Sequence, residues 1–315
     1  MSRGGYVLIS PCRDEARFLP VTLASVASQT LPPTRWVIVD DGSRDATPAI
    51  LSDAARRYPY IEVVRREDRG ERSVGPGVID AFHAGLERIR LDECDYLCKL
   101  DTDLEIPRRY FETVLARFEV EPRLGTFSGK LYLRADDGRL RLEPTGDDNS
   151  VGPAKFYRAE CFRAIGGFVR EVCWDGIDGH TCRMEGWIAR SEDGPDLRLV
   201  HLRQMGSSHE GIWTGRKRWG MGKWFMGSAW YYMLAVALYR MTERPYLIGG
   251  IGILTGYLEA ALKGVKRFGD QKFRRHLRRY EARVLLCGRR RAAETYHRPR
   301  AGTGSEPVGM GGAER

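Results

Sequence analysis

The sequence RWVIVDDGS, residues 35–43, joins a short apolar run to two adjacent carboxylates and a turn. The sequence YLCKLDTD, residues 96–103, repeats this arrangement and ends in Asp101 and Asp103. Continuous apolar runs that end abruptly in polar residues are typical of strands buried on both faces of a parallel sheet. Ligands of open α/β sheets bind at the carboxyl ends of such strands. We therefore expect both acidic clusters to line one crevice.

The segments around these two runs alternate between strand and helix patterns. The expected strands are residues 6–10, 35–39, 61–64, 96–100, 124–133 and 197–202. The expected helices are residues 17–30, 46–57, 76–90, 107–119, 156–168 and 179–190, with a loop at 134–154. Strands that alternate with helices in this way predict an α/β fold with a doubly wound, mostly parallel sheet.

The charge of the chain is distributed unevenly. The 315 residues carry a formal net charge of +9. Residues 1–200 contain 29 Lys and Arg against 34 Asp and Glu, whereas residues 201–315 contain 22 against 8. A uniformly basic protein is thereby excluded. We expect an α/β domain at residues 1–202, a basic, aromatic-rich helical region at 203–297 and a disordered tail at 298–315.

The cysteines and the N-terminus indicate the compartment. The seven cysteines are odd in number, and none has the spacing of a zinc or redox site. We expect free thiols in a reducing environment. The first residues enter a strand-like run without a secretory apolar segment, so we expect the functional part to face the cytoplasm.

The acidic residues at the two strand ends suit a nucleotide and a metal ion. Asp101 and Asp103 can both reach one hard divalent cation, Mg²⁺ or Mn²⁺, which can also bridge a diphosphate. Asp40 and Asp41 can accept hydrogen bonds from a nucleobase or a ribose. Taken alone, either pair could instead cap a helix or lie in solvent. Their combination in one sheet predicts a nucleotide–metal site.

The chain has no Gly-x4-Gly-Lys-Ser/Thr phosphate loop, so we expect the metal to hold the phosphates. His201 and His209 are candidates for a third metal ligand, although a histidine at a strand end is often only hydrogen-bonded. Arg203 is a further candidate to neutralise a diphosphate. Arg69 and Arg72 could clamp a donor phosphate, or could belong to a solvated loop.

Several motifs in this order resemble one enzyme family. They are PCRDE (11–15), SQT (28–30), VDDGS (39–43), KLDTD (99–103), YRAECFRAIGG (157–167) and WDGID (174–178). This set resembles glycosyltransferase family 2, over about residues 6–285. The resemblance implies the GT-A fold, a nucleotide-sugar donor, a divalent cation and inversion at the anomeric carbon.

The resemblance also implies roles for individual residues. Asp103 would be the principal metal ligand, and Asp101 would contact the ribose or the metal. The nucleotide pocket would be lined by Pro11, Arg13 and Glu15, with Asp41 at the base and Asp40 beside it.

The resemblance places the general base on an acidic residue where a helix opens. We predict Asp178 as this base, with Asp175 as the alternative, which could instead be a helix N-cap. Trp174 is expected to stack on a sugar face, or else to be a buried aromatic residue.

The C-terminal third combines short apolar runs, at residues 225–238 and 246–258, with Trp, Tyr, Lys and Arg. Both runs are shorter than a membrane-spanning helix requires. The pattern is typical of helices that lie in a membrane interface. The alternatives are packing on the α/β domain or on a second copy in a homo-oligomer. A nucleic-acid surface is disfavoured because no recognition motif is present.

These observations together predict a peripheral or monotopic enzyme at the cytoplasmic face of the cell membrane. It would transfer a single hexose from a nucleotide-sugar, expected to be a UDP-sugar, to a lipid-linked saccharide in exopolysaccharide or cell-surface glycan assembly. The alternative enzyme makes a polyprenyl-phosphate hexose. The alternative outside the enzymes is a basic nucleic-acid-binding protein.

Overall fold

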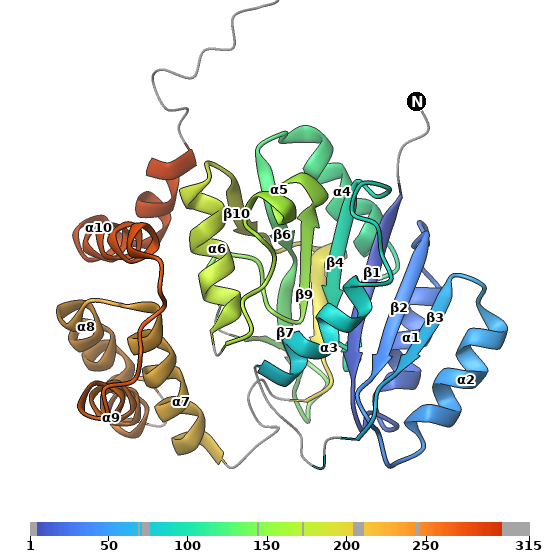
Figure 1. Cartoon of the computed structure of the whole chain (residues 1–315), viewed down its shortest axis with the longest axis horizontal. Coiled ribbons are helices and arrows are strands. Elements are labelled where there is room, and N and C mark those ends of the chain that lie inside the picture. Colours follow the sequence, from blue (N-terminus) through green and yellow to red (C-terminus); the bar gives the residue numbers. More distant parts are fainter. Residues whose placement is uncertain are drawn as a thin grey trace, which may run out of the picture.

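The centre of the molecule is a seven-stranded sheet (Figure 1). Its strands are β1 (Tyr6–Cys12), β2 (Arg35–Asp40), β3 (Ile61–Arg65), β4 (Tyr96–Leu100), β6 (Leu124–Ser128), β9 (Ala154–Arg158) and β10 (Ile188–Ser191). They lie in the order β10-β6-β9-β4-β1-β2-β3, and only β9 runs antiparallel to its neighbours. The expected mostly parallel sheet is confirmed. The computed structural model describes residues 5–68, 70, 76–143, 145–171, 173–203, 211–243 and 246–297.

Helices cover both faces of this sheet. They are α1 (Leu19–Ala27), α2 (Thr47–Arg57), α3 (Pro76–Leu86), α4 (Tyr110–Val120), α5 (Ala159–Ala164) and α6 (Trp174–Met184). Leu8 of β1 packs on the face that α1, α2 and α4 cover. Its neighbours Val7 and Ile9 point to the opposite face and pack with α3, α5 and α6. Because successive side chains of the strand are buried on opposite faces of the sheet, the sequence of the strand is a continuous apolar run.

A second, smaller sheet lies beside the carboxyl ends of the main strands. It has the order β5-β11-β7-β8, with β5 (Leu104–Glu105), β7 (Lys130–Arg134), β8 (Leu140–Leu142) and β11 (Arg198–His201). The expected single strand at 124–133 is therefore wrong, because β6 and β7 belong to different sheets. The chain changes sheet at Gly129, where a Cβ would come within 1.9 Å of the Leu197 carbonyl oxygen. A glycine permits that close approach of two backbones.

Two further expectations need correction in the second half of the domain. Residues 156–158 lie in β9 rather than in a helix, and Phe156 and Tyr157 are fully buried there. The next long helix, α6, begins at Trp174 instead of residue 179, and it is followed by β10 within the segment expected to be helical. Short buried apolar runs fit a helix or a strand equally well, so periodicity alone cannot separate the two.

The C-terminal region is helical, as expected. It contains α7 (Gly211–Met226), α8 (Trp230–Met241), α9 (Ile248–Leu262) and α10 (Gln271–His297), which is interrupted at Gly288. Ile177 of α6 forms one apolar cluster with residues of α7 and α10, so this region packs against the α/β domain. Among the described residues, we find no helix with the length and apolar character that crossing a bilayer requires. Residues 298–315, the expected tail, lie outside the described part of the chain.

Helices α7 and α9 lie side by side because glycines remove the side chains between them. A Cβ on Gly220 would come within 2.0 Å of the Ile253 carbonyl oxygen, and a Cβ on Gly256 would come equally close to the Lys217 carbonyl oxygen. We expect Gly220→Ala to lower the free energy of unfolding by about 1–3 kcal/mol, because the helices must separate. Urea unfolding would measure this change.

Gly215 on the same helix is the matched control, since a Cβ there has no neighbour within 4 Å. Gly215→Ala should instead stabilise the protein, by about 0.5–1 kcal/mol, through the lower entropy of the unfolded chain. Equal effects of the two substitutions would contradict this account of the α7–α9 contact.

Candidate active site

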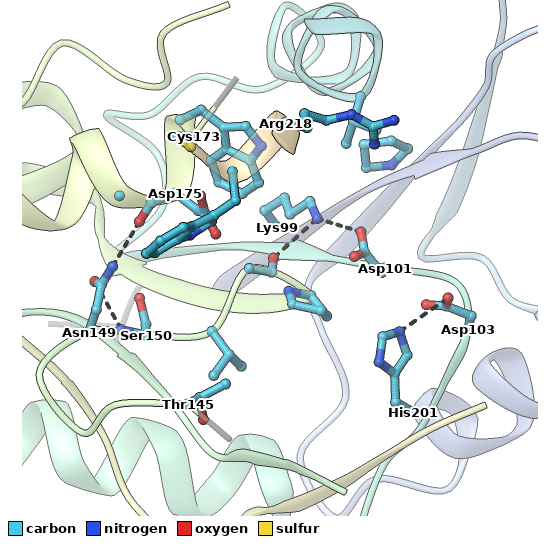
Figure 2. A pocket seen from close by; sticks show the side chains of 18 of the residues that line it. Lys99, Asp101, Asp103, Thr145, Asn149, Ser150, Cys173, Asp175, His201 and Arg218 are labelled. Atoms are coloured by element: carbon cyan, nitrogen blue, oxygen red, sulfur yellow. Dashed lines mark hydrogen bonds and ion pairs between the residues drawn. The ribbon is translucent and has the colours of Figure 1, made fainter. Parts of the chain in front are cut away.

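A cavity of about 620 Å³ opens where the main strands end (Figure 2). The segments that follow β1, β2 and β4 contribute Arg13, Glu15, Asp41, Asp101 and Asp103 to its lining. The two acidic clusters therefore share one cavity, as the carboxyl ends of parallel strands require. The opposite wall is made by the loop before β9 and by helices α6, α7, α8 and α10.

The carboxylates of the Asp101-Thr-Asp103 motif are paired with cations. The Lys99 ammonium lies 2.5 Å from Asp101 Oδ1, and Arg203 Nε lies 2.6 Å from Asp103 Oδ2. Burial raises the pKa of Asp101. Burial also acts to raise the pKa of Asp103, but His201 and Arg203 outweigh it and lower that pKa. Asp103 is therefore the carboxylate that stays ionised most readily at this strand end.

His201 lies between two carboxylates. Its Nε2 is 3.4 Å from Asp103 Oδ2, and its Nδ1 is 3.0 Å from Glu143 Oε2 (Figure 2 shows the contact with Asp103). Burial acts to lower the pKa of His201, but its hydrogen bonds to Asp103 and Glu143 raise the pKa to about 9. Glu143 follows the edge strand β8, and no sequence motif marks it as part of the site.

This group of residues fits a divalent cation in its chemistry. Within the described ranges, no three His, Cys, Asp or Glu side chains already surround one point as ligands. However, the buried Oδ1 of Asp103 has no hydrogen-bond partner in the described part of the chain. Asp103, Asp101 and the Nε2 atom of His201 together offer oxygen and nitrogen donors of the kind that Mn²⁺ or Mg²⁺ accept. A metal-binding histidine commonly donates a hydrogen bond from its other ring nitrogen to a carboxylate, as His201 Nδ1 could to Glu143.

The expected nucleotide pocket is built around Arg13. Its guanidinium donates to the Asp41 carbonyl oxygen at 2.8 Å and to Asp68 Oδ1 at 2.7 Å, which fixes the segment after β1 to those after β2 and β3. Pro11, Glu15 and Asp41 line the cavity beside it. Asp40 does not line the cavity; it is buried, and its Oδ1 accepts the Ser43 N–H at 2.9 Å. Asp40 thus supports the turn that presents Asp41.

Three expected site residues lie outside the described part of the chain. They are Arg69, Arg72 and His209.

The two candidates for the general base occupy different surroundings. Asp178 is buried, its carboxylate lies 2.6 Å from the Lys155 ammonium, and it accepts the Tyr157 hydroxyl. Burial raises its pKa, and Asp178 does not line the cavity. Asp175 is exposed and lines the cavity, and its carboxylate makes no hydrogen bond or ion pair with any described residue. The geometry therefore favours the alternative, Asp175.

Trp174 lines the cavity beside Asp175 but is largely buried. Its ring packs against Phe168 at 4.6 Å between centroids and lies 5.2 Å from the Lys99 ammonium. Trp174 is therefore a wall of the cavity, with part of its ring open to a ligand.

Cations of the C-terminal helices also line the cavity, although none of them was expected at the site. They are Arg218 and Lys223 of α7, Arg240 of α8 and Arg289 of α10. The aromatic ring of Trp219 lies between the first two along α7 and lines the cavity with them. The regular placement of Arg, Trp and Lys on one helix was the available signal, but it fits a membrane surface equally well.

Proteins and solved structures that are similar to this chain include enzymes that transfer sugars. The beta-monoglucosyldiacylglycerol synthase of Synechocystis sp. is 23% identical over 205 residues, which cover 59% of this chain and 40% of that protein. The chain thus spans less than half the length of this relative. A mannosyltransferase of Pyrobaculum calidifontis, solved with GDP-Man and Mn²⁺, is similar with a TM-score of 0.51 at 17% identity, over 94% of this chain and 88% of that one. Staphylococcus aureus TarS 1–349, solved with UDP-GlcNAc, has a TM-score of 0.51 at 14% identity, over 93% of this chain and 89% of that one.

Both structural likenesses confirm the expected GT-A type of fold. The family model "Glycosyl transferase family 2" matches residues 7–166, from the first strand through the Asp101-Thr-Asp103 motif to the end of α5. On the strength of that match and of the fold, the chain belongs to glycosyltransferase family 2 and is a transferase enzyme.

Proposed function

We propose that the protein transfers a single hexose from a nucleotide-sugar to an acceptor hydroxyl, with inversion at the anomeric carbon and with Mg²⁺ or Mn²⁺. One observation carries this proposal: a single cavity combines the Asp101–Asp103 strand end with an exposed, unpaired carboxylate, Asp175, on the facing helix. The first group suits a divalent cation that binds a diphosphate leaving group, and the second is suited to accept a proton.

The donor is expected to bind along the ends of β1, β2 and β4. Arg13 and Asp68 hold the walls of this part of the cavity, and Asp41 lines it where it would meet the base. A UDP-sugar remains our proposed donor. It is consistent with the similar solved structures, whose ligands are GDP-Man and UDP-GlcNAc.

Asp103, Asp101 and His201 would hold the cation. When bound, such a cation supplies positive charge that stabilises the departing nucleoside diphosphate. Arg203 is paired with Asp103 and with Glu15, at 2.6 Å each, and lines the same cavity. Its guanidinium is therefore placed to contact the diphosphate as well.

Asp175 is the base that we propose. As the acceptor oxygen forms its bond to the anomeric carbon, its proton passes to the Asp175 carboxylate, and the bond from that carbon to the phosphate oxygen breaks. The Lys155 ammonium joins the Asp175 carbonyl oxygen, at 3.1 Å, to the Asp178 carboxylate. Asp178 thus positions the start of α6 without touching the substrate.

The substitution Asp175→Asn should lower kcat by about 100-fold or more, because the amide cannot take the proton. The melting temperature and the KM for the donor should change little, since this carboxylate is exposed and unpaired. Steady-state kinetics with a panel of nucleotide-sugars would measure these effects.

The matched control is Glu185→Gln, which alters an exposed carboxylate at the other end of the same helix. Asp178→Asn should instead destabilise the fold by about 3–5 kcal/mol, because it leaves the Lys155 ammonium buried without its counter-ion. Normal turnover by Asp175→Asn, together with an inactive but fully folded Asp178→Asn protein, would return the role of base to Asp178.

Removing divalent cations with EDTA should abolish transfer, and Mn²⁺ or Mg²⁺ should restore it. Asp103→Asn should raise the Kd for Mn²⁺ at least tenfold in the presence of UDP, because it removes the best-placed ligand. Titration followed by electron paramagnetic resonance measures free Mn²⁺ directly. Asp53→Asn, an exposed carboxylate on α2, is the control. Unchanged Mn²⁺ affinity in Asp103→Asn would place the cation elsewhere.

We also propose that α7, α8 and α9 rest on the cytoplasmic face of the membrane, where a lipid-linked acceptor would reach the cavity. Large apolar side chains are exposed along these helices; they include Ile212, Trp213, Trp230, Leu234, Leu238, Tyr239, Ile248, Ile251, Leu258 and Leu262. Exposed Trp and Tyr among Lys and Arg suit the headgroup layer. A second copy of the chain is the alternative cover for the same surface.

The double substitution Trp230→Asp and Leu238→Asp should abolish flotation with anionic liposomes at low salt, because it places charge in the apolar surface. Val120→Asp, which alters an 81% exposed apolar side chain on α4, should float as the unmodified protein does. If the unmodified chain does not float but forms a dimer, and the double substitution dissociates that dimer, the surface binds a second copy of the chain.

A further inference from the structure

The two walls of the cavity differ in charge. The strand ends contribute the carboxylates Glu15, Asp41, Asp101 and Asp103 against the cations Arg13, Lys99 and Arg203, with His201 beside them. Helices α6, α7, α8 and α10 contribute five cations, whereas the carboxylates on that side are Asp148 and Asp175. Only the strand-end wall is close to neutral without a ligand. Glu243, which pairs with Arg240, and Glu281, which acts on Lys223, offset part of the positive charge of the helical wall. The positive charge that remains would suit a second anion.

Two cations of the helical wall stand out because neither forms an ion pair, although the buried Glu281 carboxylate acts electrostatically on Lys223. Arg218 and Lys223 are half-buried on α7, and no carboxylate in the described residues lies within ion-pair distance of either. The Lys223 ammonium instead lies 5.3 Å from the centre of the Trp219 ring. By comparison, Arg240 is paired with Glu243. A half-buried cation without an ion-pair partner, such as Arg218, is costly unless a ligand supplies the negative charge.

A deeper cation adds to this excess. Arg183 of α6 is 2% exposed, lines the cavity, and its Nε has no hydrogen-bond partner in the described part of the chain. Burial and the charges of Arg183, Lys223 and Arg289 hold the pKa of the neighbouring His180 well below its ordinary value. These cations therefore add to the effect of burial on His180.

The surroundings of these cations indicate what carries the anion. Trp219, Met226 and Trp174 give the same part of the cavity apolar sides. Arg240 lines the cavity, while its neighbours on α8, Leu238 and Tyr239, are 56% and 64% exposed on the outer apolar surface. A ligand whose charged end is at α7 would thus find an apolar surface for its remainder. This combination suits an amphiphile better than a polar acidic glycan.

We propose that Arg218 and Lys223 bind a phosphate group on the acceptor, so that the acceptor is a phosphorylated lipid or a saccharide linked to one. This inference rests on the proposed function, because it assumes that the helical wall is the acceptor side of a transferase. Its specific content is a second anion site, separate from the one for the donor diphosphate. Lys223 and the proposed base Asp175 line the same cavity, and both act electrostatically on Cys173.

Calorimetric titration of the full chain with farnesyl phosphate, in the presence of UDP and Mn²⁺, tests this site. Farnesyl phosphate should bind at least tenfold more tightly than farnesol, inorganic phosphate or glucuronic acid. Arg218→Gln and Lys223→Gln should each weaken that binding about tenfold, and Lys223→Arg should restore it. Lys217→Gln is the control, since Lys217 is on the same helix but is paired with Glu259 outside the cavity.

Three results would overturn the proposal. They are equal binding of farnesol and farnesyl phosphate, tighter binding of glucuronic acid, and an effect of Arg218→Gln on UDP affinity alone with Lys223→Gln unchanged. Hydrolysis of the donor in the presence of Mn²⁺ distinguishes failure of the phosphate-site proposal from failure of the proposed function. If donor hydrolysis persists while farnesyl phosphate does not bind, the transferase proposal stands and the phosphate site is refuted.

Discussion

The need to balance buried carboxylates at the strand ends shapes this site more than any other constraint. Glu15 and Asp103 are each 2% exposed, and an ionised carboxylate is unstable in such surroundings without a cation. Arg203 contacts both of them. Because Arg203 follows β11 of the small sheet and Glu15 follows β1 of the main sheet, this pairing joins the two sheets at the cavity. The cavity is therefore held in shape by charges that a bound cation and diphosphate would rearrange.

The same principle separates structural carboxylates from functional ones. Asp178 is paired with Lys155 and accepts the Tyr157 hydroxyl, so its negative charge is used to hold β9 against α6. Asp175, three residues earlier, has no such partner and faces the cavity. A carboxylate that is already satisfied contributes to the fold, whereas an unsatisfied one is available for a substrate proton. Arg218, which forms no ion pair with a described residue, is the corresponding case among the cations.

Much of this arrangement could be predicted from the sequence, because it depends on local pattern. Apolar runs that end in Asp40-Asp41 and Asp101-Thr-Asp103 specified the parallel sheet and the edge where the cavity opens. The errors came where tertiary contacts decide. The chain turns from one sheet to the other at Gly129, because the Leu197 carbonyl oxygen approaches it there, and no local signal records that approach. Glu143 and His201 meet across two sheet segments that are far apart in the chain.

The C-terminal third shows the same limit of prediction: the sequence reveals how much charge is present, but not where each charge lies. Its excess of Lys and Arg was clear from composition, but composition does not tell which face of α7 a cation occupies. Some of these cations line the cavity, while large apolar residues of α8 and α9 are exposed. One helical region thus carries both cations that line the cavity and an exposed apolar surface.

The most direct test of the account is anomalous diffraction from crystals of the protein grown with Mn²⁺ and UDP. The account predicts a manganese peak within bonding distance of Asp103, with the Arg203–Asp103 pair opened and Arg203 turned toward the diphosphate. A manganese peak away from Asp103, with the Arg203–Asp103 pair intact beside bound UDP, would contradict it.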